Sequence, residues 1–198
     1  MNLTVKEIQE WLAAFGRTIE KNKDYLSDLD TPIGDGDHGN NMNRGMSEYT
    51  IAFEAKQPTT ISDTFKVLSM ALISKVGGAS GPLYGSAFVN LTKATKDVTE
   101  ITSQKQLGEL LETGLAGIQA RGKATPGDKT MVDVWNTVVQ ELKNSDLTKA
   151  GIEAAKENTK EMVAKKGRAS YLGERSLGHI DPGAASSALL FQSLLSYL

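Results

Sequence analysis

The chain has 198 residues, of which 22 are basic and 24 acidic, so its formal charge is −2 at pH 7. This balance does not indicate a basic surface, and we expect no nucleic-acid partner. The absence of cysteine excludes disulfide bonds and thiol catalysis and fits a reducing compartment. The N-terminus has no basic stretch leading into an apolar segment, and the most apolar stretch, 188–198, is too short to span a bilayer. We therefore expect a cytoplasmic globular protein that does not associate with membranes.

Apolar residues recur at helical spacing along the whole chain. Thr4 and Glu7 match a capping box, and the apolar stripe that follows predicts a helix over residues 5–22. The same pattern predicts further helices over 40–55, from Thr60 or Ser62 to Gly77, from Pro82 to Ala94, from Thr102 or Ser103 to Gly122, from Thr130 to Leu142, from Thr148 to Lys166, and from Gly183 to the C-terminus. No period-2 pattern of a strand competes with these helices. The prediction is an all-α fold: one domain over residues 1–198, built as an antiparallel eight-helix bundle or barrel.

The glycines are concentrated in every second connection between the predicted helices. They lie within residues 34–45, 77–85, 122–127 and 167–183. Alternate connections of an antiparallel bundle lie at the same end, so these four loops should gather there. This arrangement is typical of a binding site made from loops on a helical scaffold.

The first of these loops is acidic. Glycine relieves the steric limits on the backbone, so Asp30, Asp35 and Asp37 can converge. Three convergent carboxylates repel one another unless a cation lies between them, and hard oxygen ligands suit Mg²⁺. The alternative is a solvated turn in which Asp37 or Asn40 caps the following helix. The spacing excludes an EF-hand, because position 12 counted from Asp35 is Met46.

The second loop, Gly77–Pro82, consists of small residues that lead directly into a helix. Its backbone amides and the helix N-terminus suit an anion, above all phosphate, although a plain helix–helix turn remains the alternative. The third loop, Gly122–Thr130, has some likeness to a Walker A sequence. It fails the spacing because Asp128 separates the second glycine from the lysine, and no buried strand precedes it.

The remaining polar candidates are two arginines and the two histidines. Arg168 and Arg175 either face a phosphate or are simply solvated. His179 precedes Asp-Pro-Gly and is interpreted as a turn residue. His38 is the better functional candidate, though it too has a capping interpretation.

The charge of the acidic loop bears on the number of metal ions. A nucleoside diphosphate carries about −3 near neutral pH, and three ionised aspartates add about −3. One divalent cation leaves about −4 in a confined site, whereas two leave about −2, which amides and an arginine can tolerate. We therefore predict two Mg²⁺ ions that bridge carboxylates and phosphates.

Four motifs in order, Gly34–Met42, Gly77–Leu83, Gly122–Met131 and Gly167–Arg175, resemble the nucleotide-binding (L) subunit of bacterial dihydroxyacetone kinase. The resemblance spans the chain and implies an eight-helix barrel that holds ADP at one end through two Mg²⁺ ions. It implies that Asp30, Asp35 and Asp37 are the metal ligands. It also implies nucleotide contacts from His38, Gly39, Asn40, Asn41, Gly78, Ala79, Ser80, Gly122, Met131, Arg168, Asp181, Pro182 and Gly183.

A chain of this length leaves no room for a substrate-binding domain. Such a stand-alone chain resembles the form of the family that works with the phosphotransferase system. The resemblance implies that bound ADP is phosphorylated to ATP by a phosphohistidine subunit. The γ-phosphoryl group then passes to dihydroxyacetone on a separate, dihydroxyacetone-binding kinase subunit. The chain shows no evident nucleophile, so no catalytic residue is predicted in it. Two alternatives stay open: a self-sufficient ATP-dependent kinase, and a nucleotide-binding module without enzymatic activity.

Overall fold

The computed structural model describes all residues, 1–198, and consists of eight α-helices and three 3₁₀ helices. The α-helices are α1 (Val5–Asp30), α2 (His38–Lys56), α3 (Ile61–Lys75), α4 (Ser80–Ala94), α5 (Gln104–Gly122), α6 (Met131–Asn144), α7 (Lys149–Glu157) and α8 (Pro182–Leu194). The 3₁₀ helices are η1 (Asn158–Glu161), η2 (Arg168–Ser176) and η3 (Leu195–Tyr197). The only β pairing is an isolated bridge between Leu3 and Ile101, so the predicted all-α class is confirmed.

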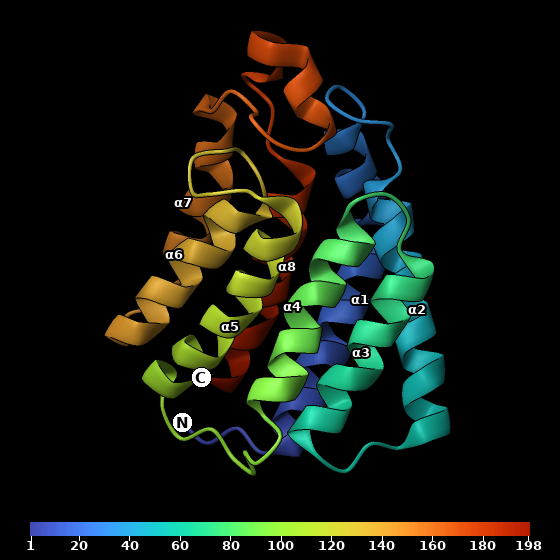
Figure 1. Ribbon diagram of the computed structural model, residues 1–198, viewed down its shortest axis with the longest axis vertical. Coiled ribbons are helices and arrows are strands. Elements are labelled where there is room, and N and C mark those ends of the chain that lie inside the picture. Colours follow the sequence, from blue (N-terminus) through green and yellow to red (C-terminus); the bar gives the residue numbers. More distant parts are fainter.

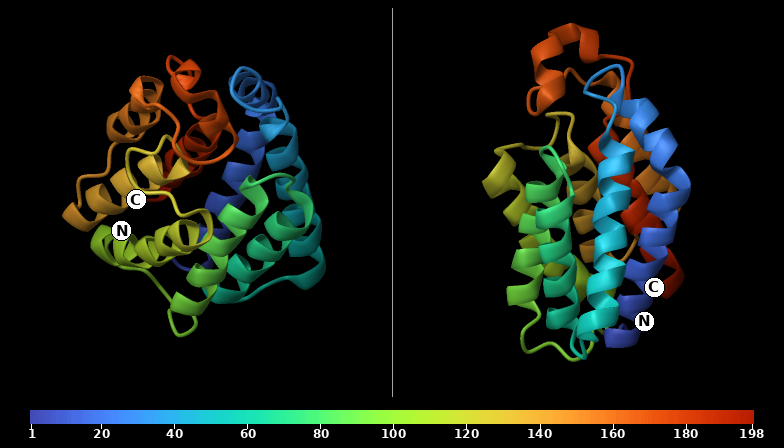
Figure 2. Two further views of the ribbon diagram at one scale, coloured as in Figure 1. Left: turned by 45° about the horizontal axis from the view of Figure 1, so that its top comes forward. Right: turned by 90° about the vertical axis from the view of Figure 1, so that its right-hand side faces the viewer.

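Consecutive helices run up and down and pack side by side (Figure 1). The last helix, α8, packs against α1, α6 and α7 and so closes the ring of helices, as the two further views show (Figure 2). The predicted antiparallel eight-helix barrel or bundle is therefore confirmed. No helix is long and apolar enough to cross a membrane.

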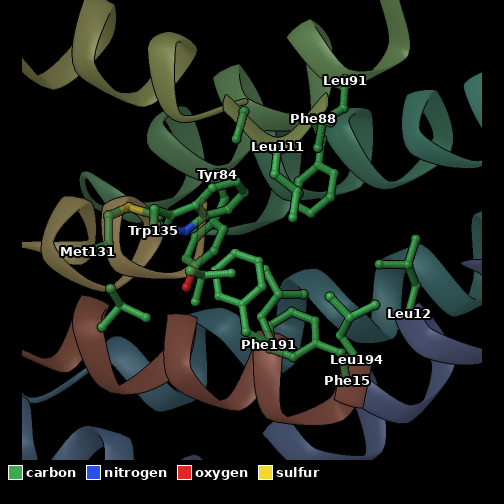
Figure 3. Close-up of a cluster of buried hydrophobic side chains, with 14 of the residues drawn as sticks. Leu12, Phe15, Tyr84, Phe88, Leu91, Leu111, Met131, Trp135, Phe191 and Leu194 are labelled. Carbon is green, nitrogen blue, oxygen red and sulfur yellow. The ribbon is translucent and has the colours of Figure 1, made fainter. Parts of the chain in front are cut away.

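A single cluster of 44 buried residues fills the inside of the ring. Its centre is a row of aromatic side chains that crosses the barrel, part of which is seen in Figure 3. Along this row the ring centroids are 6.5 Å apart for Trp11–Phe65, 5.7 Å for Phe65–Phe88, 6.4 Å for Phe88–Trp135 and 4.9 Å for Trp135–Phe191. Because these residues come from α1, α3, α4, α6 and α8, the row connects helices from all sides of the barrel.

Capping residues set most of the helix starts. Thr4, Thr60, Ser103, Thr130 and Thr148 each accept a hydrogen bond from a backbone N–H of the first turn. These groups would otherwise have no partner within the helix. The starts predicted at these positions are confirmed.

Two predicted helix ends are wrong. The first helix does not stop at residue 22 but continues to Asp30, because Leu26 and Asp30 continue the buried face that begins at Ile8. The seventh ends at Glu157 instead of near Lys166. The chain then forms η1, and Met162 is extended, so the remaining residues of the predicted helix belong to a long connection.

The four glycine-rich connections lie at one end of the barrel, and both chain termini lie near the other (Figure 1). Three of these connections are short. The fourth, residues 158–181, contains η1 and η2 and projects beyond the helix ends, in orange in Figure 1. We call residues 158–181 the flap.

Candidate functional site

A cleft opens where the four connections meet. Every connection contributes to its lining, which consists of Asp30, Ile33, Asp35, Asp37, His38, Asn41, Gly77, Gly78, Ala79, Ser80, Leu83, Thr130, Met131, Lys166, Gly167, Arg168, Ala169, Asp181, Pro182 and Gly183. The sequence-based expectation of a loop-built site at one end of the bundle thus matches the position of the cleft.

The three aspartates converge at one side of this cleft. Each offers a carboxylate oxygen, and these oxygens all lie within 4.8 Å of one another. Asp30, at the end of α1, is buried, while Asp35 and Asp37 are exposed. The Asp30 carboxylate accepts hydrogen bonds from the amides of Asp37, at 3.0 Å, and His38, at 3.2 Å. A Cβ atom at Gly34 would overlap the Asp30 carboxylate, so only glycine fits at that position.

The electrostatics of the trio differ from residue to residue. Burial raises the pKa of Asp30, although the two amide hydrogen bonds act in the opposite direction. The pKa of Asp35 is lowered, first by a hydrogen bond with the Asp37 side chain and also by the neighbouring Arg168. Oxygen donors at this spacing fit a hard divalent cation such as Mg²⁺. Asp37 occupies the N-cap position of α2 but makes no capping hydrogen bond, so the structure does not support the capping alternative for it.

His38 lies at the start of α2 with its ring buried beside the cleft. Its Nδ1 lies 3.1 Å from Ser80 Oγ, and its Nε2 lies 2.9 Å from Ser186 Oγ on α8. Burial lowers the pKa of His38 to about 4, so the imidazole is neutral near neutral pH. His38 is therefore fixed between the second glycine-rich loop and α8.

Asp181 lies at the N-cap of α8 on the opposite wall. Its carboxylate accepts a hydrogen bond of 2.8 Å from the Ala184 amide, and its own amide donates to Thr159 Oγ1 at 3.0 Å. Burial raises the pKa of Asp181 to about 7.

The flap is held at its two ends by Lys129 and contacts residues 31–37, which carry Asp35 and Asp37 and which we call the metal loop. Lys129, fully buried, donates to the carbonyl of Thr159 at 2.5 Å and to the carbonyl of His179, which lie near the two ends of the flap. Arg168, at the start of η2, forms an ion pair with Asp35. Ala164 and Ala169 pack on Ile33 of the metal loop in a small apolar cluster of their own.

A second cavity adjoins the cleft between α4, α5 and α6. The two cavities share Ala79, Leu83, Thr130, Met131, Lys166 and Gly167. The second is lined further by Pro82, Ile118, Arg121, Gly122, Ala124 and Val132. Its walls are largely apolar, in contrast to the acidic side of the cleft. The two cavities together can take an elongated ligand with one charged and one flat, apolar end.

Most of the predicted nucleotide contacts lie on these two cavities. Those on the cleft are His38, Asn41, Gly78, Ala79, Ser80, Met131, Arg168, Asp181, Pro182 and Gly183, and Gly122 lies on the second cavity. Gly39 and Asn40 line neither. Gly39 packs against the backbone of α1 at Lys23, and Asn40 is exposed on α2. The individual contacts remain predictions.

Sequence reasoning did not single out Lys129, Thr159, Tyr84 or Ser186 as parts of the site. A serine pair in the otherwise apolar last helix was the available signal for Ser186. Lys129 has no comparable signal, because a lysine in a loop is ordinarily solvated. Neither Arg175 nor His179 lines either of these two cavities.

Comparisons with known proteins agree with this geometry. The family model described as the DAK2 domain matches residues 32–196. The chain is 55% identical to the PEP-dependent dihydroxyacetone kinase 1, ADP-binding subunit DhaL, of Listeria innocua over 93% of this chain and 92% of that protein. It is 50% identical to the PTS-dependent dihydroxyacetone kinase, ADP-binding subunit DhaL, of Lactococcus lactis over 98% of this chain and 97% of that protein.

A solved structure shares the fold. The crystal structure of the dihydroxyacetone kinase from C. freundii in complex with AMP-PNP and Mg²⁺ matches with a TM-score of 0.75 and 24% identity, over 98% of this chain and 34% of that one. The helical barrel therefore corresponds to about a third of that longer protein. By its sequence and its fold, the chain belongs to the DAK2 domain family.

Proposed function

We propose that the chain is the ADP-binding subunit of a phosphoenolpyruvate-dependent dihydroxyacetone kinase. It would receive a phosphoryl group from a phosphohistidine subunit of the phosphotransferase system onto bound ADP. It would then pass that group from ATP to dihydroxyacetone held on a separate kinase subunit. The observation that carries the proposal is the convergence of three aspartate carboxylates within 4.8 Å at the mouth of a loop-built cleft. The 55% and 50% identity to ADP-binding subunits over almost the whole of both chains supports it.

The donor set of the cleft fits two Mg²⁺ ions with a diphosphate. Asp30, Asp35 and Asp37 would hold the metal, which when bound neutralises phosphate charge and orients the transferring group. Gly78, Ala79 and Ser80, at the start of α4, line the same cleft, and backbone amides at a helix start together with a hydroxyl suit phosphate oxygens. The apolar second cavity suits the base of the nucleotide.

In the proposed reaction, this chain would position the nucleotide and supply charged groups that neutralise its phosphates. Arg168 can exchange its partner Asp35 for a phosphate oxygen as the acidic loop takes up metal. The flap, fastened by Lys129, keeps that guanidinium at the cleft. The acceptor is held on the dihydroxyacetone-binding subunit, so the base for its hydroxyl would come from that subunit. The function fits a cytoplasmic location.

Metal-dependent binding of ADP tests the proposal. Asp35→Asn and Asp37→Asn should weaken ADP binding by more than about tenfold in titration calorimetry with Mg²⁺. The metal-free, nucleotide-free variants should keep their stability to within about 0.5 kcal/mol, because both side chains are exposed. Asp28→Asn, which changes an exposed carboxylate two residues before Asp30, is the matched control and should bind normally. Unchanged ADP affinity in both site variants would contradict the assigned ligands.

Two further measurements separate the alternative functions. A self-sufficient kinase would turn over ATP with dihydroxyacetone as the purified chain alone, which we do not expect. A module without enzymatic activity would bind ADP but would show no labelled phosphate in the bound nucleotide after mixing with the phosphorylated donor subunit. The relay predicts that label.

A further inference from the structure

A row of hydrogen-bonded polar groups runs from the cleft into the core. It begins at Ser80 Oγ, which lies 3.1 Å from His38 Nδ1, and continues from His38 Nε2 to Ser186 Oγ at 2.9 Å. Tyr84 Oη lies 2.7 Å from Ser186 Oγ. Tyr84 and Ser186 are fully buried and lie away from the cleft surface. The proposed function gives them no part.

The row ends on an indole. Tyr84 Oη also lies 2.9 Å from Ser187 Oγ, which lies 3.1 Å from Trp135 Nε1. Figure 3 shows the side chains of Tyr84 and Trp135 next to each other. The cleft and the core are thus connected by an unbroken series of hydrogen bonds.

The indole sets the direction of the inner hydrogen bonds. An indole N–H can only donate, so Ser187 Oγ accepts from Trp135. The hydroxyl hydrogen of Ser187 then goes to Tyr84 Oη, its remaining partner, and Tyr84 donates in turn to Ser186 Oγ. Ser186 is thereby an acceptor from Tyr84 and keeps one hydrogen of its own to donate.

The hydroxyl hydrogen of Ser186 has two acceptors within reach, His38 Nε2 and the Gly183 carbonyl. Which of them accepts it decides whether the Ser80 hydroxyl can donate a hydrogen bond into the cleft. If Ser186 donates to His38 Nε2, at 2.9 Å, the neutral ring carries its hydrogen on Nδ1 and donates to Ser80. The Ser80 hydroxyl is then free to donate into the cleft. If Ser186 donates to the Gly183 carbonyl, at 3.1 Å, the ring carries its hydrogen on Nε2 and Ser80 must donate to Nδ1. Only oxygen lone pairs then face the cleft.

We propose that Tyr84 and Ser186 are positioning residues that, through His38, turn the Ser80 hydroxyl into a hydrogen-bond donor for a phosphate oxygen of the bound nucleotide. Phosphate oxygens only accept hydrogen bonds. If Ser80 donated its hydrogen to His38 Nδ1, its oxygen lone pairs would face the negatively charged phosphate, which is unfavourable. The inference rests on the proposed function, since it needs a phosphate in the cleft. It deepens that function by assigning the tautomer of His38 and the residues that hold His38 from the core side.

The histidine tautomer in the whole chain is the direct test. With ¹⁵N-labelled histidine and saturating Mg²⁺ and ADP, the ring nitrogens of His38 should show a protonated Nδ1 and a bare Nε2. His179 serves as a second histidine in the same spectrum, and His38→Gln identifies which signals belong to His38. A protonated Nε2 in the ADP-bound wild type overturns the inference, whatever any variant does.

Two variants test the positioning role through affinity. Ser186→Ala and Tyr84→Phe should each weaken ADP binding by roughly three- to tenfold, the effect of one lost hydrogen bond. In Ser186→Ala the preference for hydrogen on Nδ1 should also disappear, which a loss of packing alone would not cause. The matched controls are Tyr49→Phe, whose buried hydroxyl has no partner, and Ser69→Ala, whose hydroxyl bonds only to its own helix turn. Both controls should bind ADP as the wild type does.

The outcomes separate this inference from the proposed function. If the wild-type chain does not bind ADP in the presence of Mg²⁺, the proposed function and this inference fail together. If the wild type binds but Ser186→Ala and Tyr84→Phe bind equally tightly, only the positioning role is overturned.

Discussion

Arg168, at the start of η2 in the flap, forms an ion pair with Asp35 of the metal loop, 133 positions earlier in the chain. Both side chains are largely exposed, at 61% and 44%. An exposed pair of this kind contributes little to stability because water screens it. Its importance is its position, since it brings the only arginine of the cleft lining to the carboxylates that would hold metal.

We expect Arg168→Gln to separate binding from stability. The free energy of unfolding of the variant should lie within about 0.5 kcal/mol of the wild-type value, because the ion pair is exposed. Its affinity for ADP with Mg²⁺ should fall severalfold, and the loss should shrink at high salt, as expected for a charge–phosphate contact. Arg175→Gln, in the same flap but on neither cavity, is the control. Urea unfolding and calorimetry at two salt concentrations measure both effects.

The pH dependence of stability should contain two opposing contributions. The pKa of Asp181 is raised to about 7, so between about pH 4 and 7 the folded chain holds a proton that the unfolded chain has lost. The free energy of unfolding therefore falls as pH rises through this window. The pKa of His38 is lowered to about 4 from 6.5, so the unfolded chain holds the extra proton in between, and stability rises with pH there.

Single variants should make each contribution visible in the metal-free chain. Asp181→Asn keeps an N-cap for α8 but removes the contribution that falls with pH. The free energy of unfolding of this variant should therefore increase as the pH rises from about 4 to 6.5. His38→Gln should show the reverse, a fall over the same range. Each slope is at most about 1.4 kcal/mol per pH unit. Denaturant unfolding at several pH values measures them, and slopes of equal sign in the two variants would refute the assignment.

Replacement of the buried Lys129 should loosen the flap. Lys129→Met leaves the carbonyls of Thr159 and His179 without their donor, which costs about 2 kcal/mol or more. Hydrogen exchange should speed up most in residues 158–181. The control is Lys123→Met in the same connection, an exposed lysine that also has a positive φ, 57° against 62° for Lys129. The control should change stability by less than about 0.5 kcal/mol.

Two glycine substitutions should act in opposite directions. Gly39→Ala would drive a methyl group into the backbone of α1 at Lys23 and should destabilise the chain by about 1–3 kcal/mol. Gly16→Ala, in the middle of α1, meets only ordinary contacts with Met46 and should stabilise the chain by up to about 1 kcal/mol. Thermal unfolding gives both signs. A neutral Gly39→Ala would mean that α1 and α2 are not held as closely as described.

Local signals explain why most of the fold could be predicted. Thr60, Ser103 and Thr130 mark helix starts because a short polar side chain satisfies the first free amides. The glycine pattern placed four connections at one end, since alternate turns of an antiparallel bundle must share an end. Neither inference needs knowledge of distant contacts.

The parts that escaped prediction depend on distant contacts. Residues 158–166 contain good helix formers, yet Lys129 holds the Thr159 carbonyl and the Thr159 hydroxyl accepts from Asp181, which fixes another path. Ser186 and Tyr84 are 102 positions apart, and no local pattern indicates that their hydroxyls meet. In the site, the acidic loop could be found from sequence because its three carboxylates lie close together in the chain.

Both chain ends lie far from the cleft, near the opposite end of the barrel (Figure 1). The 15 residues of α4 alone span about 22 Å, so a tag attached to either end would be separated from the bound nucleotide by the length of a helix. The protein can therefore be immobilised on a sensor surface through either end with its open mouth toward the solution. Affinities for ADP obtained in that format should agree with those obtained free in solution.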